Sequence, residues 1–218
     1  MDYKDSDKIS KKEIKKQNLV AVALDFFIEN GIEEAKVNDI ALTANLNERT
    51  AFRYFENKAQ LVFDATILLW TRIRQKVIDD FDLNCDKSIL GIDKLEFIVK
   101  SYLNLFYTSK KELLFMNEAE IYLSRNKLMF ANINTPKDSY INSNGPLALA
   151  IKEGVKDGSI KNDKSLNYLY YNTYDAILGI LEKMALNMIG ESNFDISRRL
   201  SLFANTITDM YRNNESSR

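Results

Sequence analysis

Residues 36–58 hold the side chains of this chain that are best suited to specific chemistry, namely hydrogen bonding to another molecule. The segment reads KVNDIALTANLNERTAFRYFENK. Ile40 and Ala41 are placed to bury a first short helix, and Asn45 suits a tight bend because asparagine tolerates a positive φ. Asn47 can cap a second short helix by accepting a hydrogen bond from a backbone N–H two or three residues later. Two short helices around a tight turn, the second rich in polar groups, are typical of the helix-turn-helix that enters the DNA major groove.

Catalysis is disfavoured by the residues that the chain lacks. It has no His, which excludes Ser-His-Asp and Cys-His nucleophile systems and the common His-containing zinc sites. The single Cys85 excludes Cys-rich metal ligation within one chain, and Gly154 and Gly158 lack the Lys-Ser/Thr sequel of a phosphate loop. Carboxylate pairs are formally available, but nothing in the sequence places two of them in one pocket. We expect a protein that is not an enzyme and binds no cofactor or metal.

The composition indicates a helical protein of a reducing compartment. A length of 218 residues allows one or two domains, and the scarcity of Pro (2) and Gly (7) favours helices. The lone Cys85 cannot form an internal disulfide, so we expect a cytoplasmic protein. A reactive thiol sensor at Cys85 is the alternative, although only Lys87 supplies a nearby positive charge. No apolar run approaches the ~20 residues that span a bilayer, and residues 1–9 are expected to be a disordered leader.

The net charge of −1 is an objection to DNA binding, since DNA-binding domains are usually basic. Basic side chains nevertheless gather locally, so a positive face is available. They lie at the start of the first helix and on or beside the second short helix: Lys8, Lys11, Lys12, Lys15, Lys16, Arg49, Arg53 and Lys58. The alternative is that the lysines form an ordinary solvated helix start.

The segment resembles the N-terminal DNA-binding motif of the TetR family of bacterial transcriptional regulators, in members that read Arg-Thr-x-Phe-Arg-Tyr-Phe-x-x-Lys. The matching residues are Arg49, Thr50, Phe52, Arg53, Tyr54, Phe55 and Lys58, with Ile40 and Ala41 upstream. The close resemblance covers roughly residues 12–65; the rest is similar only in its helical organisation and in the run AIKEGVKDGSIK at 150–161. The family often has Thr in place of Lys36 and Gly in place of Asn45. Lys36 therefore removes a probable N-cap, at a cost of about 1 kcal/mol, although a lysine there could contact a phosphate.

The resemblance implies a DNA-binding surface on the second short helix. We expect Arg49, Thr50 and Arg53 to contact base edges, with Glu48 beside them on the same helix. Phosphates, which position a protein without specifying sequence, are expected to be held by Tyr54, Lys36, Asn47 and Lys58. Phe52 and Phe55 are expected to be chiefly structural. The alternative is a structural helical hairpin whose polar face is only solvated.

The whole chain is predicted to be all-α, with no strand of useful length. A capping box at residues 10–13 opens the first helix and Gly31 ends it. Further helices are predicted at 37–44, 48–54, from Lys58 to about 81, 90–107, 110–125, 146–157, 164–190 and 194–213. The inner face of the helix after Lys58 is predicted to be Leu61, Ala65, Leu68, Leu69, Ile73 and Val77. Residues 109–112 and 192–195 are read as further capping boxes, 126–144 as a loop, and Gly158 as a helix end. The resulting domains are a three-helix DNA-binding domain at 10–57 and a helical ligand-binding and dimerisation domain at 58–218.

The last two helices carry the clearest signal for association. The first has an apolar stripe at 4-3-4-3-4 spacing, Tyr170, Tyr174, Ile177, Leu181, Met184 and Met188. The second repeats this rhythm with Ile196, Leu200, Phe203, Ile207 and Met210. Apolar residues also lie off the first stripe, and a helix that is apolar on two faces must be buried on both. The family resemblance implies a two-fold four-helix interface and recognition helices about 34 Å apart on a palindromic operator. The alternative is a central helix buried within a monomer.

A small-molecule pocket is expected in the second domain. Its candidate lining residues are Trp70, Phe97, Tyr102, Phe106, Phe115, Met116, Tyr122, Tyr171 and Tyr174. Aromatic residues at helical spacing also suit a plain core, but buried tyrosine hydroxyls need hydrogen-bond partners, as in a lined cavity. A flat aromatic compound and a fatty acyl chain fit equally well.

These features favour a homodimeric, ligand-responsive regulator, expected to be a repressor of transcription whose partners are double-stranded DNA and a small-molecule effector, with no membrane. Effector binding would shift the helix that begins at Lys58. The rival is an interaction protein on the same scaffold with weak DNA binding, which the missing cap at Lys36 and the absence of net positive charge favour. A small-molecule carrier without regulatory output has no separate support.

Overall fold

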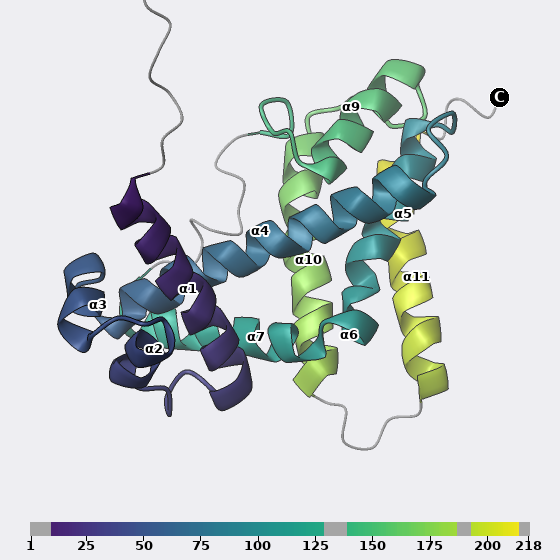
Figure 1. Cartoon of the computed structure of the whole chain (residues 1–218). Helices are drawn as coiled ribbons and strands as arrows, with labels where there is room; N and C mark the ends of the chain where they lie inside the picture. Colours follow the sequence, from purple (N-terminus) through teal and green to yellow (C-terminus); the bar gives the residue numbers. More distant parts are fainter. Residues whose placement is uncertain (1–9, 129–138, 187–192, 214–218) are drawn as a thin grey trace, which may run out of the picture.

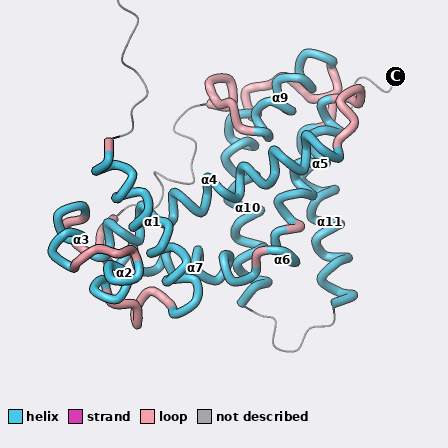
Figure 2. The backbone as a smooth tube through the Cα atoms, in the orientation of Figure 1, coloured by secondary structure: helices cyan, strands magenta, loops and turns pink. Residues whose placement is uncertain are grey.

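The computed structural model describes residues 10–128, 139–186 and 193–213. These are folded into helices joined by short loops, and the described residues form no strand (Figures 1 and 2). The helices are α1 (Lys11–Asn30), α2 (Val37–Thr43), α3 (Glu48–Tyr54), α4 (Lys58–Asn84), α5 (Gly91–Leu103), α6 (Leu105–Thr108), α7 (Lys110–Arg125), α9 (Pro146–Asp157), α10 (Leu166–Leu186) and α11 (Asn193–Tyr211). The predicted all-α class is confirmed. None of these helices is long and apolar enough to cross a membrane.

Short-range hydrogen bonds begin and end the N-terminal helices. The Ser10 hydroxyl accepts from the backbone N–H of Glu13 at 3.1 Å, so the predicted start of α1 is confirmed. Gly31 follows α1 with a φ of 77°, a value that glycine adopts without strain. A cap that we had not predicted opens α4, where the Asn57 side chain accepts from the N–H of Gln60 at 2.9 Å. Polar side chains three residues before a free N–H therefore account for these helix starts.

Two predictions between residues 90 and 112 are wrong. Ser109 does not cap α7; its backbone has φ −143° and ψ 42°, and its hydroxyl instead accepts from Lys76 Nζ at 3.3 Å. The expected continuous helix at 90–107 is interrupted at Asn104. After the interruption the chain continues as α6, in which Leu105 and Phe106 are both buried next to α7. In both places a distant contact outweighs the local pattern.

The C-terminal boundaries are confirmed in part. Helix α9 spans the predicted 146–157, and Gly158 follows it in the left-handed conformation with φ 81°. Helix α10 begins at Leu166, two residues later than expected. Its predicted end at 190, the proposed capping box at 192–195 and the leader at 1–9 lie wholly or partly outside the described residues.

Helix α4 is the central element, running from the N-terminal helices to the opposite end of the molecule (Figure 1). Its buried residues include Leu61, Ala65, Leu69, Ile73 and Val77, as predicted, whereas Leu68 is only half-buried. Helices α1 and α7 pack against it, and α5 packs against both it and α9. The core therefore continues from the N-terminal helices into the rest of the chain.

Helices α5 and α9 approach very closely. A Cβ atom on Gly91 would lie 2.0 Å from the backbone nitrogen of Gly154. Residue 90, which precedes α5, is a leucine and offers no side-chain cap. The end of α9 supplies the cap instead. Asp157, its last residue, accepts through Oδ2 from the N–H of Gly91 at 2.7 Å, and Ser159, just after it, accepts through Oγ from the N–H of Ile92 at 3.1 Å. The start of α5 is thus capped by tertiary structure.

Candidate nucleic-acid interface

The turn between α2 and α3 has the geometry that its sequence predicts. Asn45 adopts a φ of 57°, and the N–H of Leu46 donates to the carbonyl oxygen of Ala41 at 2.8 Å. The Asn47 side chain accepts from the N–H of Thr50 at 2.8 Å and caps α3. By contrast α2 begins after Lys36, whose side chain makes no capping hydrogen bond, as its residue type predicts. Two short helices are thereby held around a tight, hydrogen-bonded turn.

Helix α3 presents a polar face outward. Ala51 and the following Phe55 are buried, and Thr50 and Tyr54 are half-buried. Arg53 is exposed, and its guanidinium carbon lies 5.7 Å from the centroid of the Tyr54 ring. The remaining polar residues of the predicted contact set on this side are also exposed: Asn47, Glu48 and Arg49. Long hydrogen-bonding side chains therefore stand on a short, rigid helix.

The expected structural role of Phe52 is wrong. Its side chain is 46% exposed, next to Arg53 on the outward face. The buried positions of α3 and its C-terminal cap are 51 and 55, four residues apart on one face, and position 52 lies about 100° around the helix from 51. Leu42 of α2 is likewise 60% exposed. The outward surface of the two helices is therefore part apolar.

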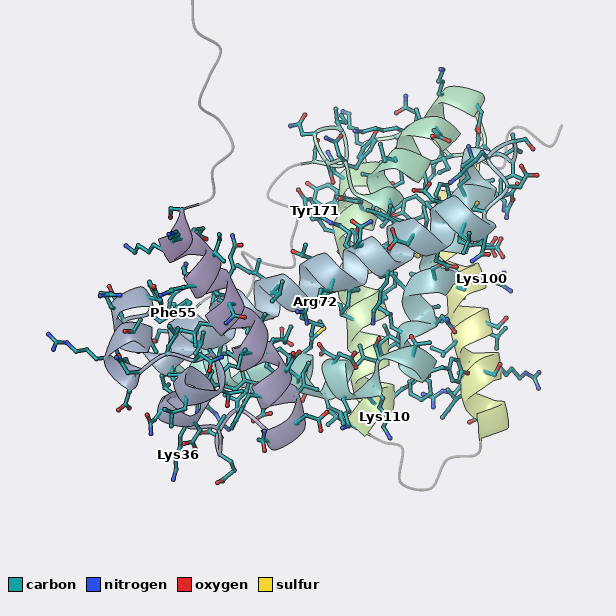
Figure 3. All side chains as sticks on the ribbon, in the orientation of Figure 1. Lys36, Phe55, Arg72, Lys100, Lys110 and Tyr171 are labelled. Atoms are coloured by element: carbon teal, nitrogen blue, oxygen red, sulfur yellow. The ribbon has the colours of Figure 1, made fainter. Side chains whose placement is uncertain are left out.

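The lysines predicted to contact phosphates differ in whether their ammonium groups already have partners within the protein. Lys36 is exposed at the edge of the N-terminal helices (Figure 3). Lys58 is half-buried; its Nζ donates to the carbonyl oxygen of Glu33 at 3.1 Å and lies 5.8 Å from the centroid of the Tyr122 ring. Burial lowers the pKa of the Lys58 ammonium, and the carboxylates of Glu33 and Glu118 oppose that effect. The structure thus gives Lys58 partners inside the protein.

The start of α1 remains basic at its surface. Lys11, Lys12 and Lys15 are exposed, whereas Lys16 forms an ion pair with Asp64 at 3.1 Å. Lys16 Nζ also lies 5.1 Å from the centroid of the Phe55 ring, which Figure 3 places among the N-terminal helices. Lys8 lies outside the described residues.

Residues 19–65 match the sequence profile of the bacterial regulatory proteins of the tetR family. The matched segment runs from the middle of α1 to the start of α4 and includes the turn between α2 and α3. No curated protein sequence matches the chain at a significant level.

Three solved structures show how far the likeness extends. A putative TetR-family transcriptional regulator from Mesorhizobium loti MAFF303099 is 13% identical with a TM-score of 0.63, covering 94% of this chain and 100% of its own. RolR in complex with resorcinol is 16% identical with a TM-score of 0.61, and the match covers 94% of this chain and 90% of RolR. FadR from Bacillus subtilis in complex with stearoyl-CoA is 15% identical with a TM-score of 0.55, and the match covers 89% of this chain and 96% of FadR. At these identities the likeness shows that nearly the whole chain shares the fold of such regulators.

Beyond the N-terminal helices, the structure divides the predicted pocket residues among several places. Phe115 stacks on Phe27 of α1, with ring centroids 6.2 Å apart, and Tyr122 lies beside Lys58. Both belong to the contact between α7 and the N-terminal helices. Phe97 packs edge-on against Phe81 at 6.0 Å, Tyr171 is half-buried, and Phe106 and Met116 are buried in the core. Sequence spacing could not separate these environments.

Tyrosine hydroxyls meet in the middle of the second part of the chain. The rings of Tyr102 and Tyr174 are edge-to-face at 5.8 Å, and Tyr170 packs on Tyr174 at 5.5 Å. The Tyr170 hydroxyl donates to Ser143 Oγ at 2.8 Å. Burial raises the pKa of Tyr102 to about 12 and also raises the pKa values of Tyr170 and Tyr174. Ser143 was missed because it stands in a stretch read as loop, and Tyr170 because its spacing was read as an interface stripe.

Two other features bear on ligand binding. Within the described residues, the indole Nε1 of Trp70 is buried without a hydrogen-bond partner. A groove of about 370 Å³ lies between α1 and α4, lined by Glu13, Lys16, Gln17, Val20, Asp64, Ile67, Leu68 and Thr71. None of the predicted pocket residues lines that groove, so the pocket among the later helices stays a prediction.

The stripes predicted to face a second copy are mostly used inside the single chain. The buried members are Ile177, Leu181, Met184, Ile196, Leu200 and Ile207; Phe203 is half-buried, Met210 is 37% exposed, and Met188 lies outside the described residues. They are buried because α11 packs on α5 and α10 packs on α7. A partner would have to contact other side chains of these helices.

Cys85 gives no sign of a reactive thiol. Its side chain is buried, and burial raises the pKa of the thiol, with Lys87 and Lys94 opposing that effect. Since the thiolate is the nucleophile, a raised pKa makes the group less reactive.

Proposed function

We propose that this chain is a ligand-responsive transcriptional regulator that acts as a repressor, binds double-stranded DNA through α3 and releases it when a small molecule binds. The observation that carries the proposal is the exposed pair Arg49 and Arg53 on a capped helix, directly after the α2–α3 turn, in a segment with the TetR-family profile. A helix so placed presents its side chains to a major groove.

The outward side chains of α3 are suited to contact bases or phosphates. Arg49 and Arg53 are suited to bidentate hydrogen bonds with guanine, and Glu48 can accept from a cytosine amino group. Phe52, which is exposed beside them, is suited to contact a thymine methyl group. Lys36 and the Tyr54 hydroxyl are left to hold phosphates, since the Lys58 ammonium already has partners.

A homodimer on a palindromic site is part of the proposal, because one short helix makes few base contacts. We propose that the partner covers the apolar and small residues that α10 and α11 leave exposed or half-exposed. These are Tyr168, Ala176, Gly179, Ile180, Leu186, Leu202, Phe203 and Met210. Two-fold symmetry would then place the two α3 helices about 34 Å apart, on successive turns of the groove.

The effector is proposed to bind among α4, α5, α7 and α10, near the hydroxyls of Tyr102, Tyr170 and Tyr174. Proteins of this fold have been solved with resorcinol and with stearoyl-CoA, so the scaffold accepts ligands of different shape. A ligand releases DNA only by binding one arrangement of the two DNA-binding domains better than the other. A preference of ~100-fold corresponds to about 2.7 kcal/mol.

A gel-shift titration with the DNA upstream of the protein's own gene tests the proposal. We expect sequence-selective binding that weakens with added salt, as phosphate contacts require. Arg53→Ala should weaken it by about 10-fold or more, because a bidentate base contact contributes about 1–3 kcal/mol. Lys156→Ala is the control, since it removes an exposed basic side chain from α9, at the far end of α4 (Figure 1).

Equal binding to unrelated DNA, or none, would instead favour a second function. That function is a protein-interaction module on the same scaffold. The uncapped start of α2 at Lys36 favours it, because it weakens the helix that supports α3.

A further inference from the structure

One face of α7 contacts the N-terminal helices along its length. The contacting side chains are spaced 4-3-4 and are therefore aligned: Lys111, Phe115, Glu118 and Tyr122. Lys111 Nζ pairs with Glu29 Oε2 of α1 at 2.7 Å, Phe115 stacks on Phe27, and the Tyr122 ring lies beside Lys58 Nζ. Helix α7 thus touches α1, the residues after it and the first residue of α4.

Glu118 is the residue of this row that forms hydrogen bonds with backbone groups of the N-terminal helical region. Its Oε1 accepts from the N–H of Ile32 at 2.6 Å and from that of Glu33 at 3.3 Å. Both donors lie in the reversal between α1 and α2, just after Gly31, where the chain has no helical partner for them. A half-buried carboxylate accepting two backbone N–H groups forms charge-assisted hydrogen bonds, which are stronger than neutral ones.

The same reversal is held from its other side by α4. The N–H of Glu33 donates to Glu118, and its carbonyl oxygen accepts from Lys58 Nζ at 3.1 Å. The segment between α1 and α2 is therefore bonded both to the first residue of α4 and to the middle of α7. Movement of α7 away from the start of α4 would therefore strain the hydrogen bonds that both helices make to this segment.

Helix α7 is also part of the region proposed to bind the effector. Met116 and Ala119, on an adjacent face of the helix, are fully buried, and α7 packs against both α4 and α10. A change in packing among those helices would displace α7 and, with it, the carboxylate of Glu118.

We propose that Glu118 is a positioning residue that couples α7 to the DNA-binding helices, by a connection separate from the covalent one through α4. The carboxylate fixes the α1–α2 reversal in the DNA-binding arrangement, and withdrawal of α7 releases it. This inference rests on the proposed function and names a residue through which its regulation passes.

Amide hydrogen exchange on the full chain tests the contact itself. In Glu118→Ala the amides of Ile32 and Glu33 should exchange about 10- to 100-fold faster than in the wild type, because a charged hydrogen bond has been lost. Glu120→Ala is the matched control, since Glu120 is an exposed glutamate on the same helix that lies near Glu182 of α10, whereas the hydrogen bonds to the reversal come from Glu118. Unchanged exchange at Ile32 and Glu33 in Glu118→Ala would overturn the proposal.

Coupling is measured by adding the duplex DNA used above, because coupling between two sites is reciprocal. In the wild type and in Glu120→Ala, DNA should slow exchange in α3, in the α1–α2 reversal and in α7. In Glu118→Ala the slowing should remain in α3 and be lost from α7. Slowing of α7 that persists in Glu118→Ala would show that α4 alone transmits the effect, and would overturn the proposal while leaving the proposed function intact.

Two further outcomes are distinguishable. If the wild type does not respond to DNA anywhere, the proposed function fails and the regulatory role of Glu118 fails with it. If Glu118→Ala does not fold, Glu118→Gln replaces it, because the amide keeps the shape and one acceptor but not the charge. Its exchange at Ile32 and Glu33 should rise by a smaller factor, and the slowing of α7 by DNA should be reduced; wild-type behaviour in both measurements would overturn the proposal.

Discussion

The Asn47 side chain accepts a hydrogen bond from the N–H of Thr50 at 2.8 Å, a donor in the first turn of α3 that has no partner four residues earlier in the helix. Asn47→Ala should therefore lower the free energy of unfolding by about 1 kcal/mol, and DNA binding should weaken with it, because α3 loses its cap. Chemical denaturation measures the first effect and a gel shift the second.

Asn38→Ala is the control for this variant, since Asn38 is an exposed residue inside α2. Its free energy of unfolding should change by less than about 0.5 kcal/mol. Similar losses in the two variants would contradict the capping role of Asn47.

Glu182 provides a prediction about pH. Burial, assisted by the nearby carboxylate of Glu120, raises the pKa of Glu182 from its ordinary 4.5 to about 7. A carboxyl group whose pKa is raised by folding binds its proton more tightly in the folded state. It therefore stabilises the fold at low pH, and this contribution is lost as the pH rises from about 4.5 to about 7.

We expect the Tm of the wild type to fall over this interval more than that of Glu182→Gln, which cannot titrate. Thermal unfolding followed by circular dichroism at a series of pH values measures the difference. Glu153→Gln, at an exposed residue paired with Lys94, should keep the wild-type dependence. Parallel curves for wild type and Glu182→Gln would show that Glu182 titrates normally.

At the scale of elements, the contact between α5 and α9 depends on glycine. A Cβ on Gly91 would lie 2.0 Å from the nitrogen and 2.3 Å from the Cα of Gly154, both backbone atoms. Gly91→Ala must therefore push the two helices apart and break the hydrogen bond from Gly91 to Asp157. We expect a loss of about 3 kcal/mol or more in the free energy of unfolding, at the upper end of overpacking effects.

Gly179→Ala is the contrasting variant, because a Cβ there would meet no atom within 4 Å. In a single chain this change should stabilise α10 by about 0.5–1 kcal/mol, through helix propensity. Chemical denaturation of both variants compares them. A Gly91→Ala protein as stable as the wild type would show that α5 and α9 can separate at little cost.

At the scale of the whole molecule, the proposed dimer depends on side chains that the single chain leaves uncovered. Leu202 is 58% exposed on α11, so Leu202→Glu should disrupt the interface without disturbing the core. Light scattering should give twice the 25.2 kDa chain mass for the wild type and a value shifted toward the single chain for the variant.

Leu83→Glu is the control, because Leu83 is 83% exposed near the end of α4 and belongs to neither of the two helices proposed to form the interface. It should keep the mass of the wild type. A wild type that is already a single chain would contradict the dimer, and with it the two-site arrangement on DNA.

The features that the sequence alone determined are those in which a residue acts on its near neighbours. The caps at Ser10 and Asn47 and the positive φ of Asn45 each act within about three residues, and all three are confirmed. The all-α class follows for the same reason, since helical hydrogen bonds and the periodicity of buried residues are local.

What only the tertiary structure decided are contacts between residues far apart in the chain. Ser109 bonds to Lys76, 33 residues away, instead of capping a helix, and Glu118 bonds to Ile32 across 86 residues. The same holds for the apolar stripes of α10 and α11, which any neighbouring surface could bury, whether in the same chain or in a second one. A pattern of residue types predicts that a side chain will be buried, but the surface that buries it depends on how the helices pack together.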